Sequence, residues 1–168
     1  MTKIRIAGIE QESIVDGPGI RLTVFTQGCL HNCPGCHNPQ THPLDGGTLM
    51  DIDDIISMVK SNSLLDGITI SGGEPFLQAV ECSILAKKVK SIGLNVITYT
   101  GYTIDEILQD SENKKGFKEL ILNTDILVDG KFDVSKRSLM LKFRGSPNQR
   151  IIDVRRTLLE NQIKLVAL

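Results

Sequence analysis

The sequence has no excess of charge of either sign, because its 19 Lys and Arg residues are matched by 20 Asp and Glu residues. A broad basic face for nucleic acid is therefore not expected. No apolar run is long enough to cross a bilayer, so no membrane association is expected. The first ten residues, MTKIRIAGIE, also lack the basic-then-apolar pattern of a secretory signal. These absences predict a cytoplasmic protein.

Repeats, low-complexity tracts and linkers are missing as well. A length of 168 residues predicts a single domain, residues 1–168, that can bury a core without disulfide bonds. Cysteine is scarce, with four residues in the whole chain. In a cytoplasmic protein, clustered cysteines are more often metal ligands or redox groups than disulfides.

Hydrophobic periodicity alternates between the strand and the helix type along the chain. Helices are expected over residues 51–61, 76–91 and 153–161, with shorter ones starting at Thr103, in a capping box with Glu106, and near Phe117. Strands are expected at KIRIAGI, IRLTVFTQ, GITIS, NVITYT, DILVDG and LMLKFRG.

This alternation predicts an α/β fold with a mainly parallel sheet. A complete eight-stranded barrel needs about 250 residues, so the prediction is an incomplete (β/α) barrel of roughly five or six strands, open on one side. Chemistry in such folds lies at the carboxyl ends of the strands.

The segment QGCLHNCPGCHNPQTH, residues 27–42, holds three of the four cysteines and all three histidines. Its Cys29-x3-Cys33-x2-Cys36 spacing suits an iron–sulfur cubane, in which three cysteines hold three irons and leave the fourth open. Cys82 shares a helical stripe with Ala79 and Leu85, which predicts a buried core residue and not a fourth ligand.

A structural zinc site remains an alternative for the same loop. The three cysteines with His31, His37 or His42 would form a Cys3His set, and the protein would then be a non-enzymatic adaptor. Zinc sites usually combine two separated ligand pairs, and the sequence offers no second pair. The spacing therefore favours an iron–sulfur cluster without excluding zinc.

The motifs resemble those of a known family. A Cys-x3-Cys-x2-Cys loop after an early strand and Gly-Gly-Glu-Pro after a later one are similar to the radical S-adenosylmethionine (SAM) enzymes. SIVDGPGIRLTVFTQGC and CPGCHNPQTH resemble the activating enzymes of glycyl-radical proteins. YTGYTIDEIL, DILVDGKF and FRGSPNQRIID are closest to the branch that activates the anaerobic (class III) ribonucleoside-triphosphate reductase.

The resemblance implies the function and its cofactors. A [4Fe-4S] cluster would bind SAM at its open iron and cleave it reductively to a 5′-deoxyadenosyl radical, which abstracts a hydrogen atom from a glycine Cα of the reductase. A low-potential, flavodoxin-like protein would donate the electron. The alternatives within this chemistry are an activase of a pyruvate formate-lyase-type enzyme and a small-molecule synthase of the deazapurine type.

The resemblance also implies residue roles. The cluster ligands, which are also the catalytic residues, would be Cys29, Cys33 and Cys36. The residues that contact SAM would be Gly35, Cys36 and His37 near adenine, Gly72, Gly73 and Glu74 near the methionyl group, and Asp129 and Lys131 at a later strand end.

The partner's glycine-bearing segment would meet the loop Asp16, Gly17, Pro18 and Gly19. Each of these segments also has a plainer interpretation. Gly72–Pro75 suits a simple strand-to-helix connection, Asp129 and Lys131 suit a solvated turn, and Asp16–Gly19 suits an ordinary turn. The roles of Arg144, Asn148 and Arg150 are left open, between contacting the partner and capping the C-terminal segment.

Overall fold

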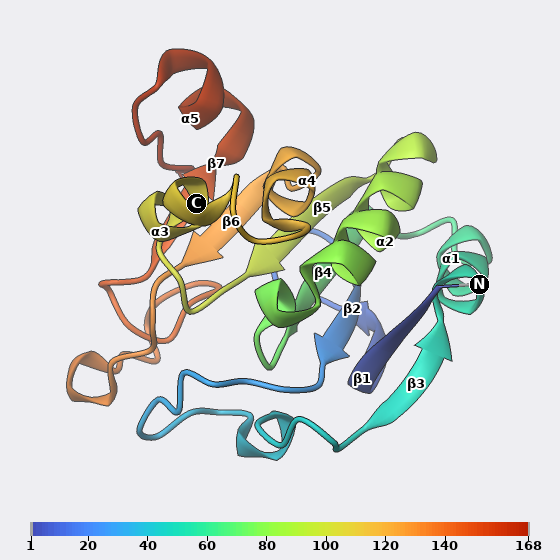
Figure 1. Ribbon diagram of the computed structural model, residues 1–168, viewed down its shortest axis with the longest axis horizontal. Coiled ribbons are helices and arrows are strands. Elements are labelled where there is room, and N and C mark those ends of the chain that lie inside the picture. The colour runs from blue at the N-terminus through green and yellow to red at the C-terminus, as the bar shows by residue number, and fades with distance from the viewer. Residues whose placement is uncertain (1, 168) are drawn as a thin grey trace.

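The computed structural model describes residues 2–167, so the first and last residues of the predicted domain lie outside it. Seven strands form one sheet in the order β3-β1-β2-β4-β5-β6-β7 (Figure 1). The strands are β1 (Lys3–Ser13), β2 (Arg21–Thr26), β3 (Thr48–Asp51), β4 (Gly67–Gly72), β5 (Asn95–Tyr99), β6 (Ile126–Asp129) and β7 (Arg150–Asp153).

The four central strands, β2, β4, β5 and β6, are parallel, as the alternating pattern predicts. The outer strands β1, β3 and β7 pair antiparallel with their neighbours. The sheet therefore has a parallel centre and two edges, β3 and β7. The predicted α/β class is confirmed, whereas the predicted barrel shape is not.

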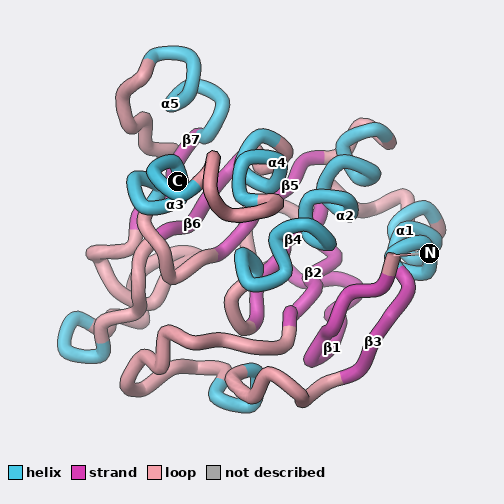
Figure 2. Tube along the Cα trace, in the orientation of Figure 1, coloured by secondary structure: helices cyan, strands magenta, loops and turns pink. Residues whose placement is uncertain are grey.

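Five α-helices and three short 3₁₀ turns complete the described chain, and α1, α2 and α4 lie along one face of the sheet (Figures 1 and 2). The helices are α1 (Ile52–Lys60), α2 (Ala79–Ser91), α3 (Ile104–Asp110), α4 (Phe117–Leu122) and α5 (Val154–Glu160). Within residues 2–167, no helix has the length and apolar character needed to cross a membrane.

The main core lies between the sheet and these helices. It contains Leu22, Ile68, Val96 and Leu127 from the parallel strands, together with Ile55 of α1. Cys82 of α2 belongs to the same core and is fully buried. The prediction that this thiol is a core residue is therefore confirmed.

One predicted strand was wrong, and two observed strands were missed. LMLKFRG forms no strand, and residues 140–145 follow an irregular path in which Phe143 has a φ of 63°. The edge strands β3 and β7 were not predicted, because each has only four residues, TLMD and RIID, without clear alternation. By contrast, the capping box of Thr103 and Glu106 is present at the start of α3.

Strand register brings the predicted motifs to one edge of the sheet. Thr26, the last residue of β2, lies opposite Gly72, the last residue of β4. The cysteine loop and the Gly-Gly-Glu-Pro turn therefore leave neighbouring strands at the same level. Parallel strands place their carboxyl ends together, where ligands bind in α/β folds.

Candidate active site

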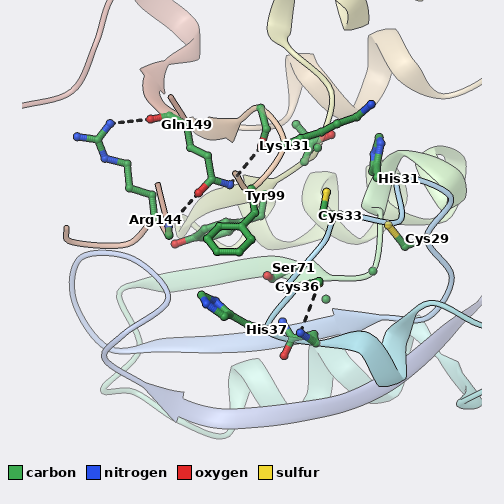
Figure 3. A pocket seen from close by; sticks show the side chains of 18 of the residues that line it. Cys29, His31, Cys33, Cys36, His37, Ser71, Tyr99, Lys131, Arg144 and Gln149 are labelled. Carbon is green, nitrogen blue, oxygen red and sulfur yellow. Dashed lines mark hydrogen bonds between the residues drawn. The ribbon is translucent and has the colours of Figure 1, made fainter. Parts of the chain in front are cut away.

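The three clustered cysteines line one cavity of about 370 Å³ at this edge (Figure 3). Cys29, Cys33 and Cys36 are all half-buried. The loop that carries them returns on itself, because Gly28 N donates to Thr41 O at 2.6 Å and Cys29 N donates to His42 O at 3.1 Å. The cysteine spacing predicted this grouping, and the structure brings all three thiols to one cavity.

The buried amide of Gln27 holds the two ends of the loop together. Its Nε2 donates to Gln40 O at 3.1 Å and to Pro43 O at 2.7 Å. A buried side-chain amide needs such partners, and here they fix the base of the cysteine loop. No sequence pattern predicted this role, since a glutamine before a glycine has no motif of its own.

Burial raises the pKa of the Cys29 and Cys33 thiols. The backbone N–H groups of His31 and Asn32 partly counteract this for Cys29, and the backbone of Phe132 and the charge of Lys131 do so for Cys33. Metal binding requires the thiolate form, so a bound metal would have to displace these protons.

The clustered thiols are not gathered around a single point in this structure. Among residues 2–167, no three His, Cys, Asp or Glu side chains converge on one point as ligands of one ion. Zinc would need every sulfur about 2.3 Å from the same centre. A cubane bonds each cysteine to a different iron, so its three sulfurs do not need to converge.

Gly72 and Gly73 line the cavity, and their lack of a side chain lets the backbone segments around it pack closely. A Cβ on Gly72, whose φ is +96°, would lie 2.5 Å from the backbone nitrogen of Thr26. A Cβ on Gly73 would collide with the carbonyl oxygen of Gly28 at the base of the cysteine loop. These glycines therefore bring β4 and the cysteine loop together. Their contact with SAM stays a prediction.

Glu74 is 1% exposed and does not line the cavity. Its carboxylate accepts from Gly101 N at 2.7 Å, Phe76 N at 3.0 Å and Thr100 Oγ1 at 2.9 Å, and lies 2.5 Å from His31 Nε2. As arranged, this carboxylate binds four protein groups. The prediction that it accepts from the amino group of SAM stays untested.

Asp129 and Lys131 are separated by the structure. The Asp129 side chain is buried beside Arg150 and accepts from Ile104 N at 2.8 Å, at the start of α3, so it does not line the cavity. Lys131 is exposed and lines the cavity. Lys131 is thus the member of this pair that a bound ligand can reach.

His37 and Gly35 occupy different positions near Cys36. His37 lines the cavity, and its ring packs against Phe132 with centroids 4.9 Å apart. Gly35 has a φ of +73° and lies against Val134 and Phe132, outside the cavity lining. The adenine contact predicted for residues 35–37 stays a prediction, and His37 is the side chain placed to make it.

The loop Asp16–Gly19 packs down onto the sheet. Asp16 and the neighbouring Val15 line the cavity, while Gly17 is buried against Arg21 and Ile97. Thr69 Oγ1 donates to the backbone oxygen of Asp16 at 2.8 Å. This segment is therefore an anchored wall of the cavity, and its contact with a partner stays a prediction.

Arg21 anchors the loop from below and is 1% exposed. Its guanidinium donates to Thr69 Oγ1 at 2.8 Å, to Pro18 O at 3.1 Å and to Asn95 Oδ1 at 2.6 Å. Burial lowers its pKa to about 10, against the opposing effect of Asp66. The groups in direct contact with this guanidinium are thus neutral oxygens.

The remaining wall comes from residues that the sequence did not assign to the cavity, Arg144 among them, whose role was left open. Tyr99 donates its hydroxyl to Phe143 O at 2.6 Å, and burial raises the pKa of that hydroxyl. Arg144 Nη1 donates to Gln149 O at 2.6 Å, within the same irregular segment (Figure 3). Tyr99, Phe143, Arg144 and Gln149 all line the cavity. No periodic pattern marks such loop residues, which only the fold brings together.

The sequence was compared with known proteins. Residues 15–152 match a protein-family model described as a 4Fe-4S single cluster domain. The chain is 37% identical over 146 residues to the anaerobic ribonucleoside-triphosphate reductase-activating protein of Vibrio cholerae, a match that covers 82% of this chain and 90% of that protein. The family-model match confirms the cluster class that the cysteine spacing predicts.

Proteins of the same name in other sources are similar at comparable levels. The one from Escherichia coli K12 is 34% identical over 151 residues, covering 84% of this chain and 94% of that protein. The one from Enterobacteria phage T4 is 32% identical over 143 residues, covering 82% and 86%. The solved structure of QueE from Escherichia coli gives a TM-score of 0.47 at 15% identity, covering 60% of this chain and 54% of that chain.

Proposed function

The chain belongs to the family of anaerobic ribonucleoside-triphosphate reductase-activating proteins, and on this premise we propose that it generates a glycyl radical on that reductase. It is an enzyme of the radical SAM oxidoreductase type. The observation that carries the proposal is the meeting of three thiols with the Gly72–Gly73 turn in one open cavity. The fourth thiol, Cys82, is buried in the main core.

The residues present fit a [4Fe-4S] cluster with three protein ligands. The three cysteine side chains share the cavity but do not converge as ligands of one ion. Cys29, Cys33 and Cys36 would hold the cluster. When bound and reduced, a cluster of this type supplies one electron to cleave SAM, giving methionine and a 5′-deoxyadenosyl radical that takes a hydrogen atom from a glycine Cα.

The protein's own residues would bind and orient the second cofactor. Lys131 places a positive charge at the cavity beside Cys33, suited to a carboxylate. His37 presents an aromatic ring next to Phe132 for a base. Gly72 and Gly73 expose backbone that a small polar group can approach, since no Cβ covers it.

The macromolecular substrate would enter from the open side of the same cavity. Val15 and Asp16 on one wall and Phe143 on another would surround the entering segment. Asp16 is fixed for this role, because Ser13 Oγ donates to its carboxylate at 2.5 Å and the loop is anchored on Thr69. A rigid wall positions a flexible guest at lower entropic cost than a mobile wall does.

The test is electron paramagnetic resonance of an oxygen-free mixture. The protein is reconstituted with iron and sulfide, reduced, and mixed with SAM and the anaerobic reductase. The proposal predicts a glycyl-radical doublet that is absent when Cys33→Ala replaces the wild type. A doublet that forms only with a pyruvate formate-lyase-type enzyme would contradict the choice of partner, and a colourless protein with one zinc would contradict the chemistry.

The electron donor is a separate part of the proposal. A reduced flavodoxin-like protein would replace the chemical reductant in the same mixture. Formation of the doublet at a comparable rate would support this donor. Its absence, with the doublet still formed by chemical reduction, would exclude this donor and leave the activation reaction intact.

A further inference from the structure

The carboxylate of Glu74 connects the ends of three parallel strands. Glu74 follows β4, and its backbone N–H donates to Gly28 O, which follows β2, at 2.7 Å. Its side chain accepts from Thr100 Oγ1 and Gly101 N, which follow β5. These contacts make Glu74 a fixed point at the carboxyl edge of the sheet.

His31 reaches this fixed point from the middle of the cysteine loop, between Cys29 and Cys33. Its Nε2 lies 2.5 Å from Glu74 Oε1, and its side chain is 10% exposed. The ring also packs edge-on against Tyr102, with centroids 4.7 Å apart. A Cβ on Gly101 would lie 2.6 Å from this ring, so the third strand end approaches His31 closely.

We propose that His31 is a positioning residue that holds the tip of the cysteine loop through Glu74 and thereby sets where the three thiols lie. The inference rests on the proposed function only in taking those thiols as cluster ligands. It assigns to His31 a structural link to the Gly-Gly-Glu-Pro turn, and not a place among the metal ligands.

The backbone of the loop tip cannot provide this constraint alone. Within residues 2–167, Pro34 has no backbone N–H, and the N–H groups of the other residues from 30 to 35 donate to no other backbone group. The nearest backbone hydrogen bond inside the loop joins Cys36 N to Cys33 O at 3.2 Å. A segment with so few backbone bonds depends on its side chains for a defined position.

The chemistry of the contact suits a rigid link. A carboxylate accepts strong hydrogen bonds, and this one is already fixed by two backbone N–H groups and a hydroxyl. An imidazole held between such a carboxylate and an aromatic edge has little freedom to rotate. Residues that orient metal ligands in this way typically change metal affinity by about 10–100-fold when they are replaced.

The experiment compares His31→Ala with His31→Gln, which keeps a side-chain N–H donor. Hydrogen exchange is measured on the metal-free protein, and retained iron and the electron paramagnetic resonance spectrum are measured after reconstitution. We expect His31→Ala to accelerate exchange at the hydrogen-bonded amides of Cys29 and Cys36 and to alter the cluster's g values. His31→Gln should restore the slower exchange and the wild-type g values at least in part.

Two threonines on β5 and its end provide a matched control. Thr100→Val removes a hydroxyl that donates to Glu74, whereas Thr98→Val removes one that pairs with Thr124 at 2.9 Å. Both side chains are buried. Thr100→Val should change the cluster spectrum in the same direction as His31→Ala, and Thr98→Val should leave it unchanged.

Unchanged exchange and g values in His31→Ala would overturn the inference, as would equal effects of the two threonine variants. The outcome is independent of reductase activation. If the loop loosens but wild type forms no glycyl radical, the positioning role stands and the proposed function fails. If wild type forms the radical and His31→Ala leaves the loop unaffected, the proposed function stands and the positioning role fails.

Discussion

Arg150 donates two hydrogen bonds to the buried carboxylate of Asp129, from Nε to Oδ1 at 3.0 Å and from Nη2 to Oδ2 at 2.6 Å. Asp129 ends β6 and Arg150 begins β7, so the pair joins the last two strands of the sheet. The same carboxylate accepts from the first amide of α3. Asp129 therefore stabilises the contact between β6, β7 and α3, whereas Lys131 lines the cavity.

Arg150→Ala should lower the free energy of unfolding by about 2–3 kcal/mol, because it leaves the Asp129 charge buried without its partner. The value lies below that of a fully buried pair, since the Arg150 side chain is 31% exposed. Urea unfolding measures the change. Arg156→Ala, which removes an exposed pair with Glu160, should cost no more than about 0.5 kcal/mol.

The pH dependence of this pair follows from Arg150. The hydrogen bond to Asp129 is the main cause that raises the pKa of the guanidinium. A raised folded-state pKa means that the stabilisation is fully present below the ordinary pKa of arginine and is lost only as pH rises through the raised pKa. The difference between wild type and Arg150→Ala should therefore be the same at pH 7 and pH 9. A stability difference that disappears by pH 9 would contradict the raised pKa of Arg150.

Cys33→Ala should abolish SAM cleavage and reductase activation, because two thiolates cannot hold three irons of a cubane. Iron and sulfide analysis, with assay of 5′-deoxyadenosine, measures the loss. A variant that keeps a catalytic cubane would refute the ligand assignment.

Cys82→Ser should leave SAM cleavage largely intact. The side chain is fully buried in the main core, and burial strongly raises the pKa of its thiol, so it is not poised to ligate metal. Burying a hydroxyl there should lower stability by about 1–3 kcal/mol. Loss of the cluster at unchanged stability would show that this thiol has a role at the metal.

Gly73→Ala should displace the cysteine loop, because the new Cβ would meet the carbonyl oxygens of Gly28 and Thr41. Neither backbone can move cheaply, so a stability loss of about 1–3 kcal/mol and lower iron retention are expected. Gly8→Ala is the matched control, since a Cβ there meets nothing within 4 Å. Equal effects of the two substitutions would contradict the close approach.

Ile14→Glu should weaken reductase activation while SAM cleavage without the reductase continues. Ile14 is 72% exposed beside Val15, so the change costs little folding energy but places a charge next to the cavity wall. Leu159→Glu on α5, where the leucine is 75% exposed, is the control. Titration of the glycyl-radical signal against reductase concentration separates the two, and equal loss in both variants would argue against this docking face.

The sequence predicted the elements whose patterns are local and strong. The spacing of Ile52, Ile55, Ile56 and Val59 gave α1, and Thr103 with Glu106 gave the start of α3. The central parallel strands followed from short apolar runs that alternate with helices. β3 and β7 were missed, and the segment around Phe143 was wrongly predicted as a strand, because their conformations depend on contacts that local sequence does not encode.

The candidate site was likewise predicted only in part from the sequence. The cysteine spacing and the glycine pair identified segments that do meet at one cavity. Sequence did not show that Glu74, which follows β4, would be enclosed by His31, which follows β2, and by Thr100 and Gly101, which follow β5. Nor did the sequence show that Arg150 would form an ion pair with Asp129.

The central claim is that three cysteines hold a cubane and leave one iron free for SAM. Mössbauer spectroscopy of protein reconstituted with ⁵⁷Fe, recorded with and without SAM, tests it most directly. The account predicts that SAM changes the parameters of one iron site in four and leaves the other three unchanged. Four irons that do not respond to SAM, or a purified protein that binds zinc and no cluster, would contradict it.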